Sequence, residues 1–196
     1  QHTSYYGGGH IDGCGPAEGH ACKNYSEDYW ERLRLSYNAN VALIDDQVGK
    51  ILESAEKRFG DDCLVIFTAD HGEMLGNHGL WGKHNCGYEE VWHIPLLVRF
   101  PGKGAPGSTG ALVNSNDILP TCLEAAGAEP TPCDGESFRQ RMADGGLGYT
   151  FAEGEGYIAV TDGTYKYIHV QKEGSNLSEL LDLREDPHEF ENRIGD

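Results

Sequence analysis

A long amphipathic helix followed at once by an apolar strand constrains this chain more than any other feature. Residues 27–59 place apolar side chains at every third or fourth position, which predicts one helix with a single apolar face. Ser26 is suited to cap its start and Gly60 to end it. Residues 63–68 are continuously apolar and rich in β-formers, as in a strand buried on both faces of a parallel sheet. The two elements together predict an α/β unit.

The next part of the chain continues this alternation. Residues 96–100 predict a second strand, which ends at a Pro-Gly pair. Residues 117–127 predict a short helix that Asn116 caps. Both segments fit the same α/β layer.

After about residue 145 the pattern becomes antiparallel. Residues 157–160 and 165–170 predict two strands that flank an Asp-Gly turn at residues 162–163. Residues 179–183 predict a third strand, and residues 186–189 have the cap, Pro and Glu of a helix start.

These elements predict three regions. Residues 1–25 are Gly-rich and without periodicity, which favours a loop segment. Residues 26–145 form the α/β portion, and residues 146–196 form a small antiparallel α+β subdomain.

Charge and hydropathy exclude several functions. The net charge is −17 and the basic residues form no cluster, so nucleic acid and anionic membrane surfaces are poor partners. No apolar run approaches the ~20 residues of a membrane-spanning helix. Any anion must therefore be bound by a local site rather than attracted from a distance.

Six cysteines permit disulfides without fixing them. Cys14 with Cys22, and Cys122 with Cys133, are close enough in sequence to pair, whereas Cys63 opens an apolar run and is interpreted as a buried thiol. Two glycosylation sequons and the even cysteine count favour an exported protein, secreted, periplasmic or lysosomal, although the chain shows no signal peptide.

A zinc site formed by Cys14, His20 and Cys22 is an alternative to the loop interpretation. The spacing of these residues matches no standard zinc finger, so the loop is preferred.

The segment from residue 68 to residue 83 carries the candidate chemistry. Asp70 and His71 leave the carboxyl end of the predicted first strand, where open α/β sheets place their ligands. A carboxylate beside an imidazole can supply two ligands to one divalent cation. Lys83 follows as a compact positive charge suited to an oxyanion. The structural alternative is that Asp70 only caps the loop.

Several stretches of the chain closely resemble the sulfatase family within the alkaline phosphatase superfamily. They are residues 39–49 (around NVALIDDQVG), residues 65–102 (VIFTADHGEMLGNHGLWGKHNCGYEEVWHIPLLVRFPG), the V-x-x-x-D-I-x-P-T-x-x-x-x-A-G pattern at residues 113–127, and ELLDLREDPHEFEN at residues 179–192. They lie in family order across most of the chain.

The resemblance implies a fold and a set of roles. The fold would be the carboxy-terminal part of an alkaline phosphatase-like mixed or parallel sheet flanked by helices, followed by the small antiparallel subdomain. Asp70 and His71 would bind a divalent cation, which the resemblance implies is Ca²⁺, with Mg²⁺ or Mn²⁺ as alternatives. Lys83 would bind the sulfate group of a sulfate ester, a small molecule or a glycan, and His84 is a second candidate substrate contact.

The resemblance also implies that half of a catalytic site is missing. Sulfatases use a formylglycine nucleophile made from Cys or Ser in a C-x-P-S-R-type motif, preceded by a paired-Asp metal site. Residues 14–18 imitate that motif, but Glu18 stands where Arg is needed. The chain is therefore interpreted as the portion without the nucleophile, and we expect it not to turn over substrate alone.

Other polar residues of the region are given supporting roles. His78 is interpreted as structural and His93 as orienting the loop. Glu73 is interpreted as a solvated or supporting group, and Asp117 as fixing the start of its helix.

Two alternative functions remain at this stage. Phosphonate or phosphodiester hydrolases of the same superfamily share the Asp-His-Gly and Lys pattern. A non-catalytic remnant that binds a cation or an anion is the second alternative.

Overall fold

The computed structural model describes residues 26–195 except 84–85, 103–105, 155 and 173–174. The predictions for residues 1–25, including the possible zinc site and the Cys14–Cys22 bond, lie outside these residues. The chain divides into two compact units. The first contains helix α1 and Thr68–Leu96, and the second contains Leu64–Phe67 and Leu97–Asp196. The domain boundary near residue 145 stays a prediction.

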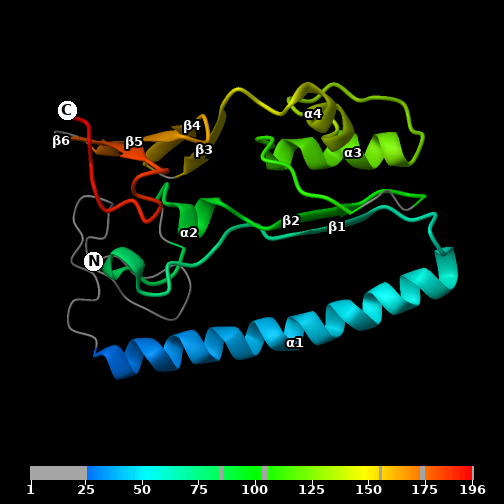
Figure 1. Ribbon diagram of the computed structural model, residues 1–196, viewed down its shortest axis with the longest axis horizontal. Coiled ribbons are helices and arrows are strands. Elements are labelled where there is room, and N and C mark those ends of the chain that lie inside the picture. The colour runs from blue at the N-terminus through cyan, green and yellow to red at the C-terminus, as the bar shows by residue number, and fades with distance from the viewer. Residues whose placement is uncertain (1–25, 84–85, 103–105, 155, 173–174, 196) are drawn as a thin grey trace. The chain divides into compact units, whose positions relative to one another are not determined.

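Helix α1 (Glu27–Phe59) has the bounds that the sequence predicts (Figure 1). The Ser26 hydroxyl accepts a hydrogen bond from the Tyr29 amide at 3.3 Å, and the Gly60 amide donates to the Glu56 carbonyl at 2.8 Å. Gly60 has φ +58°, which few other residues adopt. Capping and periodicity therefore define this helix locally.

The apolar face of α1 is largely exposed. Trp30 is the one residue of the helix that is buried, at 8 % exposure, whereas Ile44 and Ile51 are 56 % and 66 % exposed. The Trp30 ring lies against Gly76, where a Cβ atom would come within 3.1 Å of it, and 6.4 Å from the ring of Trp81. The first turns of α1 thus pack on the loop that follows β1.

This loop forms the core of the first unit. It contains the short 3₁₀ helix η1 (Asn77–Gly79) and helix α2 (Glu89–Trp92). Its buried side chains are Met74, Leu80, Cys86, Tyr88 and Val91. A contact of 3.7 Å between the sulfur atoms of Cys86 and Met74 lies inside this core.

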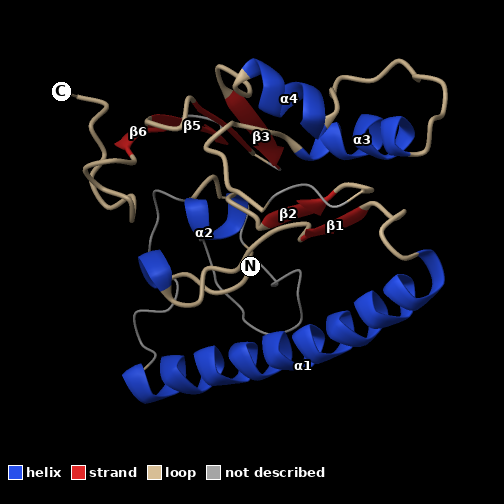
Figure 2. Cartoon of the chain, turned by 45° about the vertical axis from the view of Figure 1, so that its right-hand side comes forward, coloured by secondary structure: helices blue, strands red, loops and turns tan. Residues whose placement is uncertain are grey.

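Strands β1 (Val65–Thr68) and β2 (Leu96–Arg99) form a two-stranded sheet (Figure 2). The sequence predicts both strands, but the expected burial of the first on both faces is wrong. Phe67 is 40 % exposed and Leu97 62 %, and within the described residues this sheet has only two strands. A continuous apolar run indicates a strand that is suited to burial on both faces. A sheet of two strands alone does not bury both faces of this strand.

The predicted short helix has a different start. A 3₁₀ turn, η2 (Ser115–Asp117), leads into α3 (Ile118–Ala125), and helix α4 (Phe138–Asp144) follows. Asn114 rather than Asn116 is the cap: its side chain accepts from the Asn116 amide, and the Asp117 carboxylate accepts from the Asn114 amide. The capping pair spans the 3₁₀ turn, which moves the cap two residues towards the amino terminus.

A four-stranded antiparallel sheet completes the second unit. Its strands are β3 (Thr150–Gly154), β4 (Tyr157–Thr161), β5 (Tyr165–Lys172) and β6 (Ser175–Asp182), and they pair in sequence order. The hairpin and third strand that the sequence predicts are present, and β3 is an addition.

The helix expected at residues 186–189 is wrong. Glu189 has φ +60°, which an α-helix does not allow, and its carboxylate forms an ion pair of 2.7 Å with Lys166 of β5. Both side chains are fully buried. The buried pair overrides the local helix signal, since a helical Glu189 would leave Lys166 without this partner.

The cysteines that the structure describes are all free thiols. Cys122 and Cys133 are exposed and do not form the bond that their spacing allows, and Cys63 is half-buried rather than buried. Among the described residues, no helix has the length and hydropathy needed to cross a membrane.

Candidate active site

Asp70 and His71 lie directly beyond β1, as the sequence predicts. The Asp70 side chain is 87 % exposed, and its Oδ1 accepts a hydrogen bond from the His71 amide at 3.0 Å. The His71 ring is partly buried, with Nδ1 2.8 Å from the Gly72 carbonyl and Nε2 3.5 Å from Oδ2 of Asp70. A carbonyl only accepts, so Nδ1 carries the proton in this bond.

This tautomer suits a metal ligand. With its proton on Nδ1, the neutral imidazole offers the lone pair of Nε2 beside a carboxylate oxygen. Asp70 and His71 therefore fit two positions around a divalent cation. Calcium takes about six to eight ligands, mostly oxygen, and the described residues contain no group of three or more His, Cys, Asp or Glu side chains that could hold a metal. The pair can contribute to a metal site but does not complete one within these residues.

The chain after His71 is fixed to α2. The Gly72 amide donates to the Val91 carbonyl at 2.9 Å and the Glu73 amide to the Glu90 carbonyl at 3.0 Å. A Cβ atom on Gly72 would lie 1.8 Å from the Glu90 carbonyl oxygen. Only glycine fits this close approach of two backbones, which sets the direction in which Asp70 and His71 leave the strand.

The loop then returns towards its start. The Gly76 amide donates to the Leu80 carbonyl at 2.9 Å, and the Met74 amide donates to the Gly82 carbonyl at 3.2 Å. Gly82 has φ +84°, and Lys83 follows it with a half-buried side chain. The segment that carries Lys83 is therefore hydrogen-bonded to Met74, which lies three residues after His71.

Other candidate residues have supporting positions. His78 has φ +53° and stacks on Tyr88, with ring centroids 3.9 Å apart, which is a packing role. Nδ1 of His93 lies 2.7 Å from a carboxylate oxygen of Glu89. Glu89 begins α2, and His93 is the residue directly after its end. His84 lies outside the described residues.

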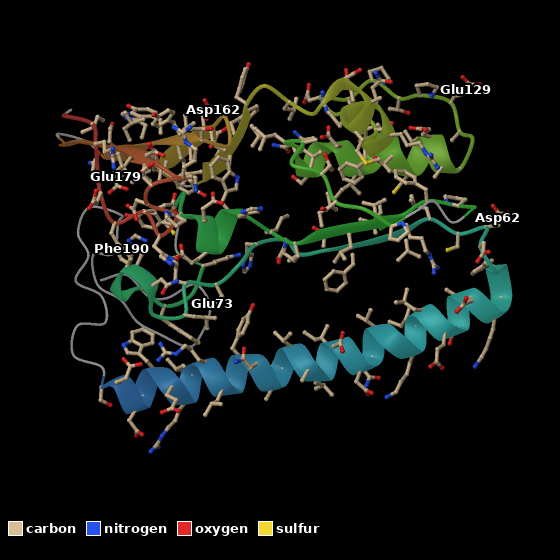
Figure 3. All side chains as sticks on the ribbon, in the orientation of Figure 1. Asp62, Glu73, Glu129, Asp162, Glu179 and Phe190 are labelled. Carbon is tan, nitrogen blue, oxygen red and sulfur yellow. The ribbon has the colours of Figure 1, made fainter. Side chains whose placement is uncertain are left out.

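Glu73 has a role that the sequence did not suggest. Its Oε1 atom accepts hydrogen bonds from the Gly82 amide at 2.5 Å and from the Leu75 amide at 3.4 Å. Figure 3 labels this side chain on the loop after β1. No sequence signal indicates such a bond, because it joins residues nine positions apart in an irregular loop.

Asp117 is a structural group, as predicted. Its fully buried carboxylate accepts from the amides of Asn114 and Glu136 at 3.0 and 2.9 Å. Two guanidinium nitrogens of Arg141 lie 3.3 Å from it. Asp117 therefore joins the start of α3 to α4.

Two family models match the chain. The model described as "Sulfatase" matches residues 8–128, and the model described as "N-sulphoglucosamine sulphohydrolase, C-terminal" matches residues 76–196.

Two curated proteins are similar over most of the chain. The multifunctional alkaline phosphatase superfamily protein PehA of Trinickia caryophylli is 33% identical over 195 residues, covering 84% of this chain and 37% of that protein. The choline-sulfatase of Rhizobium meliloti is 32% identical over 181 residues, covering 85% of this chain and 34% of that protein. The chain thus spans about a third of the length of these relatives.

Two solved protein structures have a fold similar to that of this chain. BT1596, a 2-O GAG sulfatase, aligns over 93% of this chain and 43% of its own with a TM-score of 0.77 at 24% identity. BT4656, solved with its substrate D-glucosamine-2-N,6-O-disulfate, aligns over 79% of this chain and 35% of its own with a TM-score of 0.68 at 27% identity.

Proposed function

This chain belongs to the sulfatase family, and we propose that it supplies the metal-binding and sulfate-binding residues of a sulfuric ester hydrolase. In this proposal Asp70 and His71 hold a divalent cation and Lys83 binds the sulfate group. The formylglycine nucleophile belongs to sequence outside these 196 residues. The substrate is a sulfate ester, either a small molecule or a glycan.

The return of the loop is the observation that carries the proposal. Asp70 and His71 follow β1 directly, and the bond from the Met74 amide to the Gly82 carbonyl ties the residue before Lys83 to a residue three positions after His71. A cation and an ammonium group then act on the same anion. The bound cation would polarise the sulfate oxygens, and Lys83 would balance the charge that develops on them.

Metal binding by the chain itself tests the first half of the proposal. Mn²⁺ is added to ¹⁵N-labelled protein and the paramagnetic broadening of each amide is measured. We expect broadening centred on Asp70 and His71, and its loss in Asp70→Asn. Asp46→Asn is the matched control, because Asp46 is an exposed carboxylate of α1 that binds Lys50. Equal broadening in the wild type and Asp70→Asn would contradict the assignment.

Turnover tests the second half. The complete protein encoded by the reading frame around this chain is assayed with an aryl sulfate. We expect Lys83→Ala to lower kcat/KM by about 10²–10³-fold, the usual cost of losing one group that stabilises transition-state charge. Lys50→Ala is the control, since Lys50 lies exposed on α1. Sulfate release by the 196-residue chain alone, dependent on Lys83, would overturn the view that the nucleophile lies elsewhere.

The coding DNA upstream of Gln1 gives an independent check. We expect an in-frame paired Asp followed by a C-x-P-S-R motif. A start codon directly before Gln1 would instead favour the non-catalytic remnant.

A phosphonate or phosphodiester hydrolase is the second candidate. It is supported by the similarity to a solved structure described as the phosphonate monoester hydrolase SpPMH from Silicibacter pomeroyi, which aligns over 78% of this chain with a TM-score of 0.65 at 28% identity. The complete protein separates the two: a higher kcat/KM for a phosphonate monoester than for the matching sulfate ester would favour this candidate.

A further inference from the structure

We propose that Glu73 is the positioning residue for Lys83: it holds the Gly82 peptide and so fixes where the Lys83 ammonium meets an anion. This inference rests on the proposed role of Lys83 in binding sulfate. In this inference Glu73 acts only through its hydrogen bond to the backbone amide of Gly82.

Glu73 and Met74 together hold Gly82 from both sides. The Glu73 carboxylate accepts from the Gly82 amide at 2.5 Å, and the Met74 amide donates to the Gly82 carbonyl at 3.2 Å. Gly82 has φ +84°, and glycine alone costs little in that conformation. Because the amide and the carbonyl of Gly82 are both hydrogen-bonded, the backbone that leads into Lys83 is restrained.

The Glu73 side chain acts from a fixed base. Its own amide donates to the Glu90 carbonyl at 3.0 Å, next to the contact of Gly72 with the same carbonyl oxygen. The carboxylate is half-buried, and a bond from an amide to an ionised acceptor is about twice as strong as a neutral one. Glu73 can therefore transmit the position of α2 to the segment that carries Lys83.

Charge and position predict opposite effects when Glu73 is changed. A carboxylate near an anion-binding site repels the anion, so its removal should strengthen anion binding if only charge matters. Removal should weaken binding if the carboxylate holds Lys83 in place. The sign of the change therefore separates a positioning role from a purely electrostatic one.

The test is a titration of the ¹⁵N-labelled chain with inorganic sulfate, followed through the amides of Gly82 and Lys83. Four variants are compared with the wild type: Glu73→Ala, Glu73→Gln, Lys83→Ala and Glu90→Ala. Glu73→Gln keeps the acceptor oxygen and loses the charge. Glu90→Ala is the matched control, since its carboxylate binds the Asn77 side chain in the same unit and does not contact Gly82.

We expect Glu73→Ala to weaken sulfate binding about five- to tenfold, which is the net contribution of one typical hydrogen bond. Glu73→Gln should lose only about two- to threefold, because the amide oxygen restores the bond in its weaker, neutral form. The Gly82 amide proton should move upfield in Glu73→Ala alone, since it loses its short bond. Glu90→Ala should change neither quantity.

The outcomes separate this inference from the proposed function. No sulfate-dependent shift at Lys83 in the wild type, or equal affinity in Lys83→Ala, would overturn the role of Lys83 and this inference with it. Loss of binding in Lys83→Ala together with unchanged or tighter binding in Glu73→Ala would overturn this inference alone. Equal loss in Glu73→Gln and Glu73→Ala would also overturn it, since an acceptor oxygen at this position would then fail to restore binding.

Discussion

The buried ion pair between Lys166 and Glu189 should control the stability of the second unit. The ammonium of Lys166 lies 2.7 Å from a Glu189 oxygen, and neither side chain reaches solvent. Removing one partner of such a pair leaves a desolvated charge and typically costs about 3–5 kcal/mol. We therefore expect Lys166→Met, which shortens the side chain by one atom, to lower the free energy of unfolding by that amount.

This cost is large for a domain of this size, because whole domains are stable by about 5–15 kcal/mol. The variant Glu189→Gln should lower the free energy of unfolding by a similar amount, since it removes the charge that pairs with Lys166 and leaves the backbone φ of +60° in place. The double variant should recover much of the loss, because no unpaired charge then remains buried. The three variants and the wild type form a double-mutant cycle.

Urea unfolding followed by circular dichroism measures the overall effect, and amide hydrogen exchange at Ile168 of β5, which is fully buried, localises it to this sheet. Lys50→Met is the control, because its ion pair with Asp46 is 62 % exposed and such pairs contribute about 0–1 kcal/mol. A loss below about 1 kcal/mol in Lys166→Met would refute the reasoning, as would a double variant whose loss equals the sum of the single ones.

Three further changes test other parts of the structure. Gly72→Ala should cost about 2–4 kcal/mol, since its Cβ would lie 1.8 Å from the Glu90 carbonyl oxygen, and faster exchange of the Gly72 amide would report the lost bond. Asp117→Ala should lower the free energy of unfolding by about 3–5 kcal/mol in urea, because the part-buried amides of Asn114 and Glu136 and the guanidinium of Arg141 lose their shared carboxylate; a loss under about 1 kcal/mol would contradict its role in joining α3 to α4. The amides of Tyr165 and Thr164 hold the pKa of Asp162 below its ordinary value of 3.8, so its stabilising contribution is complete above that pH and is lost as the pH falls through the lower folded-state pKa. Acid titration of the Thr164 amide shift should follow that pKa in the wild type and disappear in Asp162→Ala.

The parts of the fold that the sequence predicts are those determined locally. Helix α1 has its own cap, period and stop signal, so its bounds need no tertiary information. The hairpin of β4 and β5 has an Asp-Gly turn, and Asp162 accepts from the amides of Thr164 and Tyr165 as that turn requires. Such signals are complete within a few residues of sequence.

The sequence does not predict, or predicts wrongly, the elements that depend on distant partners. Strand β3 contains Ala, Glu and Gly, which are poor β-formers, and pairing with β4 makes it a strand. The segment around Glu189 has a good local helix signal, but burial with Lys166 decides its conformation. Tertiary partners outweigh local preference in both cases.

The candidate site divides in the same way. Asp70, His71 and Lys83 are predicted as site residues because their types and their order follow a family pattern. The contact of Glu73 with Gly82 could not, because it depends on how an irregular loop folds back on itself. Roles carried out through the backbone leave little trace in residue type.

The packing of Trp30 gives this protein a built-in optical probe. All three tryptophans of the chain, Trp30, Trp81 and Trp92, belong to the first unit, and two of them lie with ring centroids 6.4 Å apart beside the loop that carries the candidate site. Intrinsic tryptophan emission therefore reports on that unit, while the antiparallel sheet contributes only tyrosine signal. A change in the spacing of Trp30 and Trp81 would alter quenching between the two indoles, so movements of the loop can be followed by fluorescence without attaching a label.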